Sequence, residues 1–269
     1  MNNTVIAAIL GVIEGLTEFL PVSSTAHLLL FGEVLGFKGP PGKTFEIMIQ
    51  LGAILALVLL YFRKLWSVTI GLPSDPMARR FAAVILVAFL PALVLGAGLN
   101  KYIKSLLDSQ QILSVIAVTF IAGGLIMIVV ELMSRHNQYH SVEEVPYKTA
   151  LAIGFAQAVA MIPGVSRSGA TIVGGLVLGL ERRTAAELSF FLAIPTMTGA
   201  FVFSAFQAWR HGELSFESSS LIAVGFVAAF LAALAVVKPF LAFITRVGFT
   251  PFAYYRIALG TLILGLIYL

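Results

Sequence analysis

The sequence contains no cysteine and few charged residues. Of its 269 residues, 11% are Asp, Glu, Lys or Arg and 59% are hydrophobic, and the mean hydropathy is +0.99. Soluble domains carry about 25% charged residues. The absence of cysteine excludes disulfide bonds, thiolate catalysis and cysteine-ligated metal sites. The scarcity of charge argues against a soluble domain and indicates an integral membrane protein.

The chain also lacks a basic tract, a cleavable leader pattern and a long polar segment. The net charge of +4 is spread over loops, so no nucleic-acid partner is expected. The N-terminal "MNNTVIAAILGVIEG" has no basic residue and is interrupted by Glu14, so we expect it to be retained rather than removed as a signal peptide. The whole chain, residues 1–269, is therefore expected to form a single membrane domain.

What the chain does have is apolar runs that are long enough to cross a bilayer. A hydrocarbon core of about 30 Å needs roughly 20 residues of helix. The runs predict an all-α polytopic membrane protein with about six transmembrane helices. They extend over residues 45–62, 81–99, 112–132, 187–206, 221–237 and 252–269.

A segment near the N-terminus recurs 143 residues later. Without gaps, "GVIEGLTEFLPVSSTAHLLLFGEVLGF" from Gly11 matches "GFAQAVAMIPGVSRSGATIVGGLVLGL" from Gly154. Further along, "AFLPAL" at Ala88 resembles "AFLAAL" at Ala229. The matches predict two related halves, residues 1–133 and 148–269. The alternative is chance similarity between membrane segments that are rich in Ala, Gly and Leu.

Each repeated segment is an apolar run that is broken by Pro, Gly and Ser and then continues as a short second piece. Neither piece spans a bilayer comfortably. We therefore predict two re-entrant helix pairs whose polar turns face protein or a water-filled cavity, with a kinked full crossing as the alternative. Three crossings after each pair would give the halves opposite orientations, which is an inverted-topology repeat.

Basic residues in the loops predict the orientation in the membrane. Ten lie on one side of the expected topology and five on the other, so the first side is cytoplasmic by the positive-inside rule, and both termini face outward. Arg256, which follows Tyr254 and Tyr255, has the pattern of an interfacial anchor. The ten are Arg63, Lys64, Arg79, Arg80, Arg135, Lys148, Arg182, Arg183, Lys238 and Arg246, and the five are Lys38, Lys43, Lys101, Lys104 and Arg210.

Two carboxylates stand in the first repeated segment, "EGLTEFLPVSSTAH". Glu14 and Glu18 are four residues apart, so on a helix they share one face. Two like charges repel each other in a low-dielectric site, so one carboxylate must hold a proton or a cation must lie nearby. The alternative is that both side chains snorkel to the membrane surface. Ionisable groups inside membrane segments are functional candidates.

Hydroxyl groups gather at the turn of both segments. The first turn supplies Ser23, Ser24, Thr25 and the imidazole of His27, and an ordinary helix N-cap is the alternative explanation. The second turn, "PGVSRSGAT", supplies Ser166, Arg167, Ser168, Gly169 and Thr171. Hydroxyls, a guanidinium and the N–H groups of a helix N-terminus form an anion site suited to phosphate.

Together the two turns contain the parts of a phosphoryl-transfer hydrolase, namely a nucleophile, a base and a charge stabiliser. A substrate that reaches a site inside the membrane is expected to carry a lipid tail. The alternative role for Arg167 is a buried ion pair with Glu14 or Glu18.

On these residues the chain resembles the bacterial undecaprenyl-diphosphate phosphatases, the bacitracin-resistance family of integral membrane enzymes. The resemblance covers essentially the whole chain and rests on "EGLTEFLPVSSTAH" and "PGVSRSGAT", with "FEIMIQLGAILA" and "FTPFAYYR" as supporting matches. It implies hydrolysis of undecaprenyl diphosphate to the monophosphate carrier of peptidoglycan and other envelope polymers. It also implies the bacterial cytoplasmic (inner) membrane and a site that opens to the periplasmic or outer face.

The resemblance assigns the motifs residue by residue. The acidic motif falls on Glu14 and Glu18. Ala26 stands where the family usually has Gly, so the placement of His27 depends on whether this residue is helical or needs a positive φ. The serine-histidine motif falls on Ser23, Ser24, Thr25 and His27, and the arginine motif on Ser166, Arg167, Ser168 and Thr171.

For the mechanism we predict that Ser24 attacks the terminal phosphorus and that Arg167 binds the phosphoryl oxygens. Glu18 and His27 would accept or relay the serine proton, and Glu14 would orient the imidazole or, with Glu18, bind Mg²⁺ or Ca²⁺. A direct attack by His27 is the alternative.

A transporter or flippase for a phosphorylated lipid or an anion is the competing function. Gln157 and Met161 occupy the positions that match Glu14 and Glu18, so only the first half keeps the acidic pair. A symmetric transport gate would more naturally keep both pairs, and the asymmetry favours an enzyme. The expected partners are a polyprenyl diphosphate substrate and membrane lipids, with a homodimer as the candidate assembly.

Overall fold

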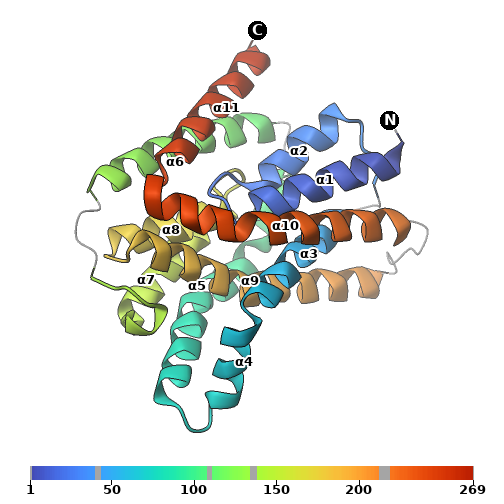
Figure 1. The fold of residues 1–269 in the computed structure, drawn as a ribbon. Coiled ribbons are helices and arrows are strands. Elements are labelled where there is room, and N and C mark those ends of the chain that lie inside the picture. Colours follow the sequence, from blue (N-terminus) through green and yellow to red (C-terminus); the bar gives the residue numbers. More distant parts are fainter. Residues whose placement is uncertain (1, 40–43, 108–110, 134–137, 212–218, 269) are drawn as a thin grey trace.

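A computed structural model of the chain describes residues 2–39, 44–107, 111–133, 138–211 and 219–268. These residues form helices, and the one β-type pairing among them is an isolated bridge between Tyr139 and Leu180 (Figure 1). In chain order the elements are α1 (Asn3–Thr17), α2 (Ser24–Val34), α3 (Thr44–Leu60), α4 (Phe62–Gly71), α5 (Pro76–Leu107), α6 (Ile112–Met133), η1 (Val142–Glu144), α7 (Tyr147–Ala158), η2 (Val159–Met161), α8 (Arg167–Val177), α9 (Arg182–His211), α10 (Ser219–Val247) and α11 (Thr250–Tyr268).

Five of the described helices, α5, α6, α9, α10 and α11, are long and apolar enough to cross a membrane. A sixth span results if α3 and α4, which meet at an angle of 73°, are counted together. The prediction of an all-α protein with about six membrane-spanning helices is thereby confirmed. The first predicted crossing, residues 45–62, corresponds closely to α3, and the chain bends at Tyr61 into α4, which carries Arg63, Lys64 and an exposed Trp66.

The two repeated segments have the same backbone geometry. Each is a helix, a turn and a second short helix, and the residue before the second helix has a positive φ, 67° at Ser23 and 65° at Ser166. Each second helix is followed by a glycine with positive φ, Gly36 at 63° and Gly179 at 90°. Both pairs of positions are 143 residues apart. This correspondence supports the division into two halves, and their opposite orientation and re-entrant insertion stay predictions.

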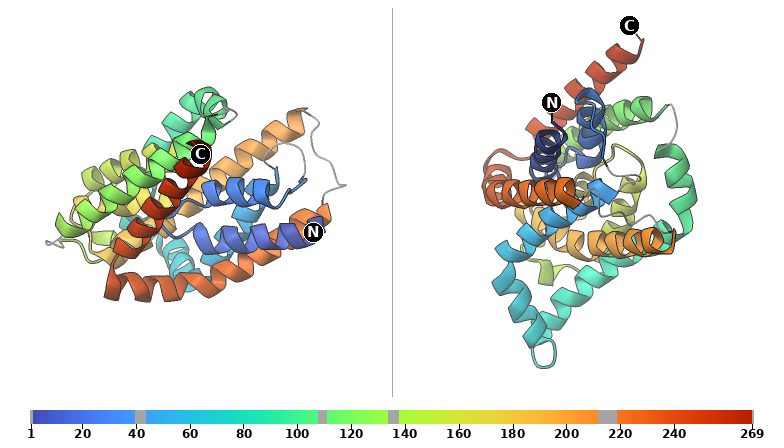
Figure 2. Two further views of the ribbon diagram at one scale, coloured as in Figure 1. Left: turned by 90° about the horizontal axis from the view of Figure 1, so that it is seen from above. Right: turned by 90° about the vertical axis from the view of Figure 1, so that its right-hand side faces the viewer.

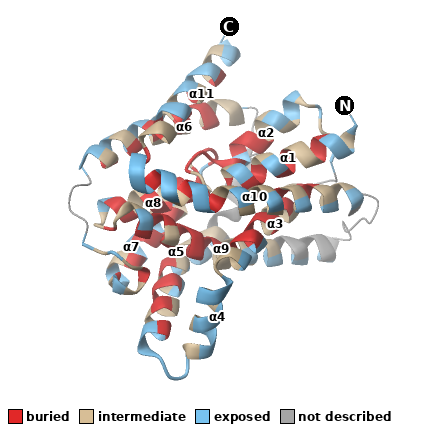
Figure 3. Ribbon diagram, viewed as in Figure 1, coloured by how far each residue is buried: buried red, intermediate tan, exposed pale blue. Residues whose placement is uncertain are grey.

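The first helix of each half packs against a helix of the other half. α1 lies along α10, α7 lies along α5, and α6 and α11 lie side by side (Figures 1 and 2). Small residues allow the close approach, because a methyl group at Gly11 would overlap the carbonyl oxygen of Gly225, and one at Gly154 would overlap that of Ala88. The turns between the short helices are therefore held in the buried centre of the molecule (Figure 3).

Gly11→Ala and Gly154→Ala are each expected to destabilise the protein by about 1–3 kcal/mol, since the added methyl group must push two helix backbones apart. Gly265→Ala is the matched control, because open space surrounds this position in α11. Alanine favours a helix interior by about 1 kcal/mol over glycine, so the control should be neutral or stabilised. Thermal unfolding in detergent checks the set. Three equal transition temperatures would contradict the close packing.

Candidate active site

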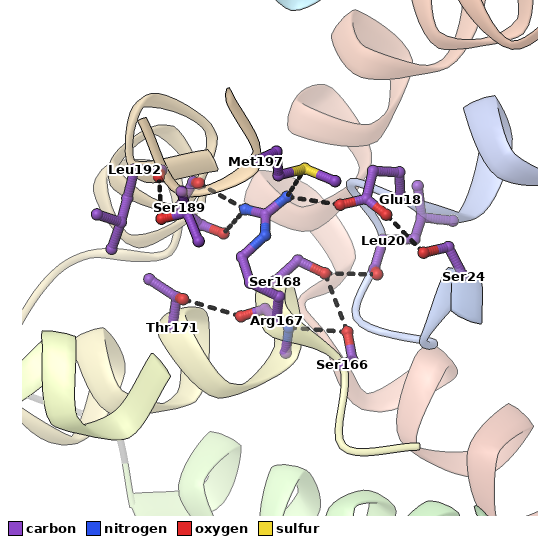
Figure 4. Close-up of polar contacts among 12 residues, drawn as sticks. Glu18, Leu20, Ser24, Ser166, Arg167, Ser168, Thr171, Ser189, Leu192 and Met197 are labelled. Carbon is purple, nitrogen blue, oxygen red and sulfur yellow. Dashed lines mark hydrogen bonds and ion pairs between the residues drawn. The ribbon is translucent and has the colours of Figure 1, made fainter. Parts of the chain in front are cut away.

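The two polar turns meet at the carboxylate of Glu18, the C-cap residue of α1 (Figure 4). Its Oε2 accepts a hydrogen bond of 2.5 Å from Ser24 Oγ, and its Oε1 lies 3.0 Å from Nη2 of Arg167. Ser24 and Arg167 are the first residues of α2 and α8 and occupy matching positions of the two halves. The structure therefore brings together the predicted nucleophile, base and charge stabiliser, with the ion pair between Glu18 and Arg167 as one of the arrangements expected from the sequence.

The guanidinium of Arg167 is oriented from a second side by α9. Its Nη1 donates to the carbonyl oxygen of Ser189 at 2.7 Å and to Ser189 Oγ at 3.2 Å. Its Nε has no hydrogen-bond partner among the described residues. Arg167 is thus held in place while one N–H donor is left for a ligand.

The hydroxyls of the second turn hold the turn itself. Ser166 caps α8, because its Oγ accepts from the N–H of Gly169 at 3.1 Å, and it also lies 3.1 Å from Ser168 Oγ. Ser168 Oγ donates to the carbonyl oxygen of Leu20 at 2.7 Å, which links the two turns directly. Thr171 Oγ1 donates to the carbonyl oxygen of Arg167 at 2.8 Å. For Ser166 the capping role is therefore seen, and phosphate binding by this group of residues stays a prediction.

His27 is buried, but its ring nitrogens are bonded away from Ser24. Nδ1 lies 2.7 Å from the carbonyl oxygen of Ser23, which can only accept, so Nδ1 carries the proton. Nε2 is then the acceptor for the hydroxyl of Tyr255, at 2.6 Å, and the two rings stack with centroids 5.7 Å apart. The proton relay through His27 stays a prediction. Thr25 of the same turn is exposed.

Sequence reasoning missed Tyr255 as a partner of the site. Tyr255 lies in the motif "FTPFAYYR". Its two adjacent tyrosines are typical of a belt at the membrane surface, and this interpretation led away from the site. The assignment of Arg256 as an interfacial anchor is wrong, because this residue is 1% exposed and its guanidinium binds backbone carbonyls inside the protein. The spacing along α11 turns Arg256 inward, and composition alone does not reveal that direction.

Ala26 lies within α2, is fully buried, and does not need a positive φ. The positive φ of this turn is at Ser23 instead. Alanine in place of the usual glycine is therefore compatible with the turn, and the side chain belongs to the buried cluster that contains Ile116 and Phe120.

Glu14 is fully buried, no donor of the described residues is bonded to its carboxylate, and its carboxyl group is within hydrogen-bonding reach of Glu18 when one of the two holds a proton. Glu18 and Glu46 are close enough to repel a charge on it. A buried carboxylate in this position needs either a proton or a cation. The described residues contain no cluster of three or more His, Cys, Asp or Glu side chains arranged to hold a metal ion. Glu14 and Glu18 offer two carboxylates.

A cavity of about 420 Å³ lies beside Arg167, between α5, α7 and α9. Its walls are largely apolar and include Phe89, Leu93, Ala200 and Phe203. Gln157 and Met161, the counterparts of Glu14 and Glu18, also line it. An apolar space lined by helices of both halves therefore lies next to the guanidinium.

Fold and site define a polytopic helical membrane protein in which a serine, a glutamate and an arginine meet at two buried helix breaks, beside an apolar cavity. The chain belongs to the family of the bacitracin resistance protein BacA, whose family model matches residues 7–262.

Three relatives are similar over nearly their full length. Undecaprenyl-diphosphatase 2 of Paramagnetospirillum magneticum is 54% identical over 261 residues, which cover 97% of this chain and 98% of that protein. Undecaprenyl-diphosphatase 1 of Agrobacterium fabrum is 53% identical over 95% of this chain and 94% of its own length. The undecaprenyl-diphosphatase of Caulobacter vibrioides is 50% identical over all of this chain and 99% of its own length.

Proposed function

We propose that this protein is a membrane phosphatase that hydrolyses undecaprenyl diphosphate to undecaprenyl phosphate and inorganic phosphate, which recycles the lipid carrier of peptidoglycan and envelope polymer synthesis. The relatives that carry this activity in their names align over nearly the whole chain. The observation that carries the proposal is the single carboxylate of Glu18 between the hydroxyl of Ser24 and the guanidinium of Arg167.

In the proposed first step, Ser24 Oγ attacks the terminal phosphorus and its proton passes to Glu18, which already accepts the hydrogen bond from this hydroxyl. A serine–phosphorus bond forms while the bond from phosphorus to the bridging oxygen breaks. The leaving group is a phosphate monoester with a second pKa of about 6, so it leaves readily without a strong general acid. Water then attacks the phosphorus of the phosphoserine, the bond from phosphorus to Ser24 Oγ breaks, inorganic phosphate leaves with the protons of the water, and Glu18 returns its proton to Ser24.

Arg167 would stabilise the charge on the phosphoryl oxygens, the main task in phosphoryl transfer. Its Nε–H has no partner among the described residues, and its bond to Glu18 is exchangeable with a phosphoryl oxygen. Such an exchange would also free Glu18 to act as the base. The alternative, attack by His27, has less support because both ring nitrogens are engaged by Ser23 and Tyr255.

The purified protein in detergent micelles is expected to release phosphate from a polyprenyl diphosphate, which a transporter without compartments would not do. Arg167→Ala should lower kcat at least about 10³-fold, as the loss of a charge-stabilising arginine does. Glu18→Gln should lower kcat by about 10²–10⁴-fold. Ser67→Ala, in the exposed α4, is the control and should keep full activity.

Trapping of the covalent intermediate identifies the nucleophile. An acid-stable phosphoserine that is absent in Ser24→Ala is expected. An acid-labile phosphohistidine would overturn the serine mechanism, and a wild-type protein that releases no phosphate would overturn the function.

The cavity between α5, α7 and α9 is proposed to receive the first isoprene units of the lipid. It is apolar, and it begins at Arg167, where the diphosphate would be bound. A site for an isoprenoid diphosphate needs this combination of an apolar space and an anion clamp.

Ala200→Trp should fill part of this cavity and raise KM for a polyprenyl diphosphate by about tenfold, the equivalent of roughly 1.4 kcal/mol of lost lipid contact. Inorganic phosphate, which has no tail, should inhibit both proteins equally. Val202→Trp, two residues away on an exposed face of α9, is the control. An unchanged KM in Ala200→Trp would contradict the assignment of the tail to this cavity.

Glu14 and Glu18 are proposed to hold a divalent cation, Mg²⁺ or Ca²⁺, together with diphosphate oxygens. Mg²⁺ is commonly bound by one or two carboxylates plus substrate phosphates, so a pair of glutamates fits this role. When bound, the cation would neutralise the carboxylates and the incoming diphosphate. The support for the proposal is that Glu14 is buried beside the carboxylate of Glu18 and is bonded to no donor of the described residues.

Glu14→Gln is expected to raise the cation concentration for half-maximal activity by at least about tenfold, because the variant loses one of two charged ligands. Without cation the variant should unfold at the same or a higher temperature than the wild type, since a buried carboxylate that is bonded to no donor of the described residues has been removed. Activity titrations with Mg²⁺ and Ca²⁺ after treatment with a chelator check both points. An unchanged cation requirement would refute the role of Glu14.

We also propose the cytoplasmic membrane of a bacterium as the location, with the site open to the outer face and both termini outward. The support for the orientation is the excess of basic residues on one side of the expected topology, and contacts link some of these residues to neighbouring elements. Lys64 pairs with Glu143 of η1, Arg80 donates to the backbone of the same residue, and Arg182 of α9 pairs with Glu131 of α6. Lys43 and Arg135 lie outside the described residues, and the homodimer stays a prediction.

A further inference from the structure

Arg256 is the most deeply buried cation of the described residues. It lies on α11 and is 1% exposed, yet its hydrogen bonds among the described residues go to backbone carbonyls and not to an acid. Its guanidinium carbon lies 5.0 Å from the ring centre of Phe120. A methyl group at Gly123 would overlap Nη2, so this glycine of α6 leaves the room that the guanidinium occupies. A buried charge of this kind is costly unless hydrogen bonds compensate for the lost water.

Both Nη atoms are bonded to backbone carbonyls that come from different parts of the chain, whereas Nε has no hydrogen-bond partner among the described residues. Nη1 donates to the oxygen of Pro21 at 3.2 Å, and Nη2 donates to the oxygen of Gly164 at 3.1 Å. Nη2 also donates to the oxygen of Thr119 in α6 at 3.0 Å. Pro21 and Gly164 are 143 residues apart, which is the offset of the repeat. One guanidinium therefore binds the carbonyl at the corresponding position of each turn.

These two carbonyls lie where the helices are broken, so they have no helical N–H partner. Unsatisfied carbonyls in an apolar interior are expensive, and a planar guanidinium with five donors can satisfy several of them at once. The turns also contain Ser23 and Ser166, whose positive φ is disfavoured for residues other than glycine. Such conformations persist only where the surroundings fix them, and Arg256 is a contact that both turns share.

The reacting groups follow these carbonyls at the same distance along the chain. Ser24 comes three residues after Pro21, and Arg167 comes three residues after Gly164. Glu18 joins Ser24 and Arg167 only if the two turns keep their relative position. The guanidinium of Arg256 contacts backbone carbonyls rather than this carboxylate, so it acts on the site through the backbone.

We propose that Arg256 is a positioning residue that fixes the two turns relative to each other, so that Ser24 and Arg167 can contact the same phosphoryl group. This inference rests on the proposed phosphatase activity. The bonds of Arg167 to Ser189 of α9 do not involve Arg256. Loss of Arg256 is therefore expected to change the position of Ser24 relative to Arg167, while both side chains stay in the site.

The test measures kcat and KM for a polyprenyl diphosphate in detergent, together with thermal unfolding, for Arg256→Ala, Arg256→Lys and Gly123→Ala. Arg256→Ala should lower kcat by roughly 100-fold with KM within about threefold, because a displacement of about 1 Å costs a rate factor of this size. Arg256→Lys keeps the charge but not the planar fork, and it should stay below about a tenth of the wild-type kcat. Gly123→Ala keeps Arg256 and crowds its guanidinium, so it should lower kcat in the same direction.

Ile263→Ala is the control for a structural effect, since this residue is buried on the same helix and lies in the cluster with Phe120. It should lower the unfolding temperature and leave kcat unchanged. A wild-type kcat in Arg256→Ala or Arg256→Lys would overturn the inference, and so would a raised KM at constant kcat. It would also be overturned if Ile263→Ala lost as much kcat as Arg256→Ala for the same drop in unfolding temperature. An inactive wild-type protein would instead refute the phosphatase activity itself.

Discussion

The structure depends on the satisfaction of polar groups inside an apolar protein. Two helices are interrupted at the centre of the molecule, and each interruption exposes backbone carbonyls and introduces ionisable side chains where water is scarce. The ion pair between Glu18 and Arg167 joins a buried carboxylate to a partly buried guanidinium, and Ser24 donates a hydrogen bond to the second oxygen of the carboxylate. Bonds to backbone carbonyls from Ser168 and Arg256 satisfy the turns themselves. The hydrogen bonds that satisfy Ser24, Glu18 and Arg167 in the folded protein thus also assemble the candidate site.

The two repeated segments share their backbone geometry and differ in chemistry. Ser24 and Arg167 stand at the same position of the repeat, and so do Ser23 and Ser166, which have nearly the same φ. The acidic pair of the first half is replaced in the second by Gln157 and Met161, which line an apolar cavity. One half therefore offers the hydroxyl and the carboxylates, the other offers the guanidinium, and both line the apolar cavity beside it. A symmetric scaffold with this division of side chains suits an asymmetric substrate with a charged head and an apolar tail.

The pattern of apolar runs predicted the helical membrane fold well, because about 20 apolar residues in a row have few alternatives to a spanning helix. The motif around Glu18 and the motif around Arg167 could be matched through the repeat, and the structure brings them together. The first crossing, residues 45–62, nearly coincides with α3, and the bend of 73° into α4 was not predicted. Arg256 was misread because the two preceding tyrosines suggested the membrane surface, and Tyr255 was missed as the partner of His27.

The sequence by itself determined which residue types the site contains, where the helices break, and that the chain lies in a membrane, because these follow from local composition and spacing. Only the tertiary structure decided which of these groups meet. It joined Glu18 to Arg167 across 149 positions, bonded His27 to Tyr255 across 228, and turned Arg256 toward carbonyls of both turns. The physical reason is that a buried polar group must find a partner wherever the packed helices supply one, and periodicity along a chain does not say which helix that will be.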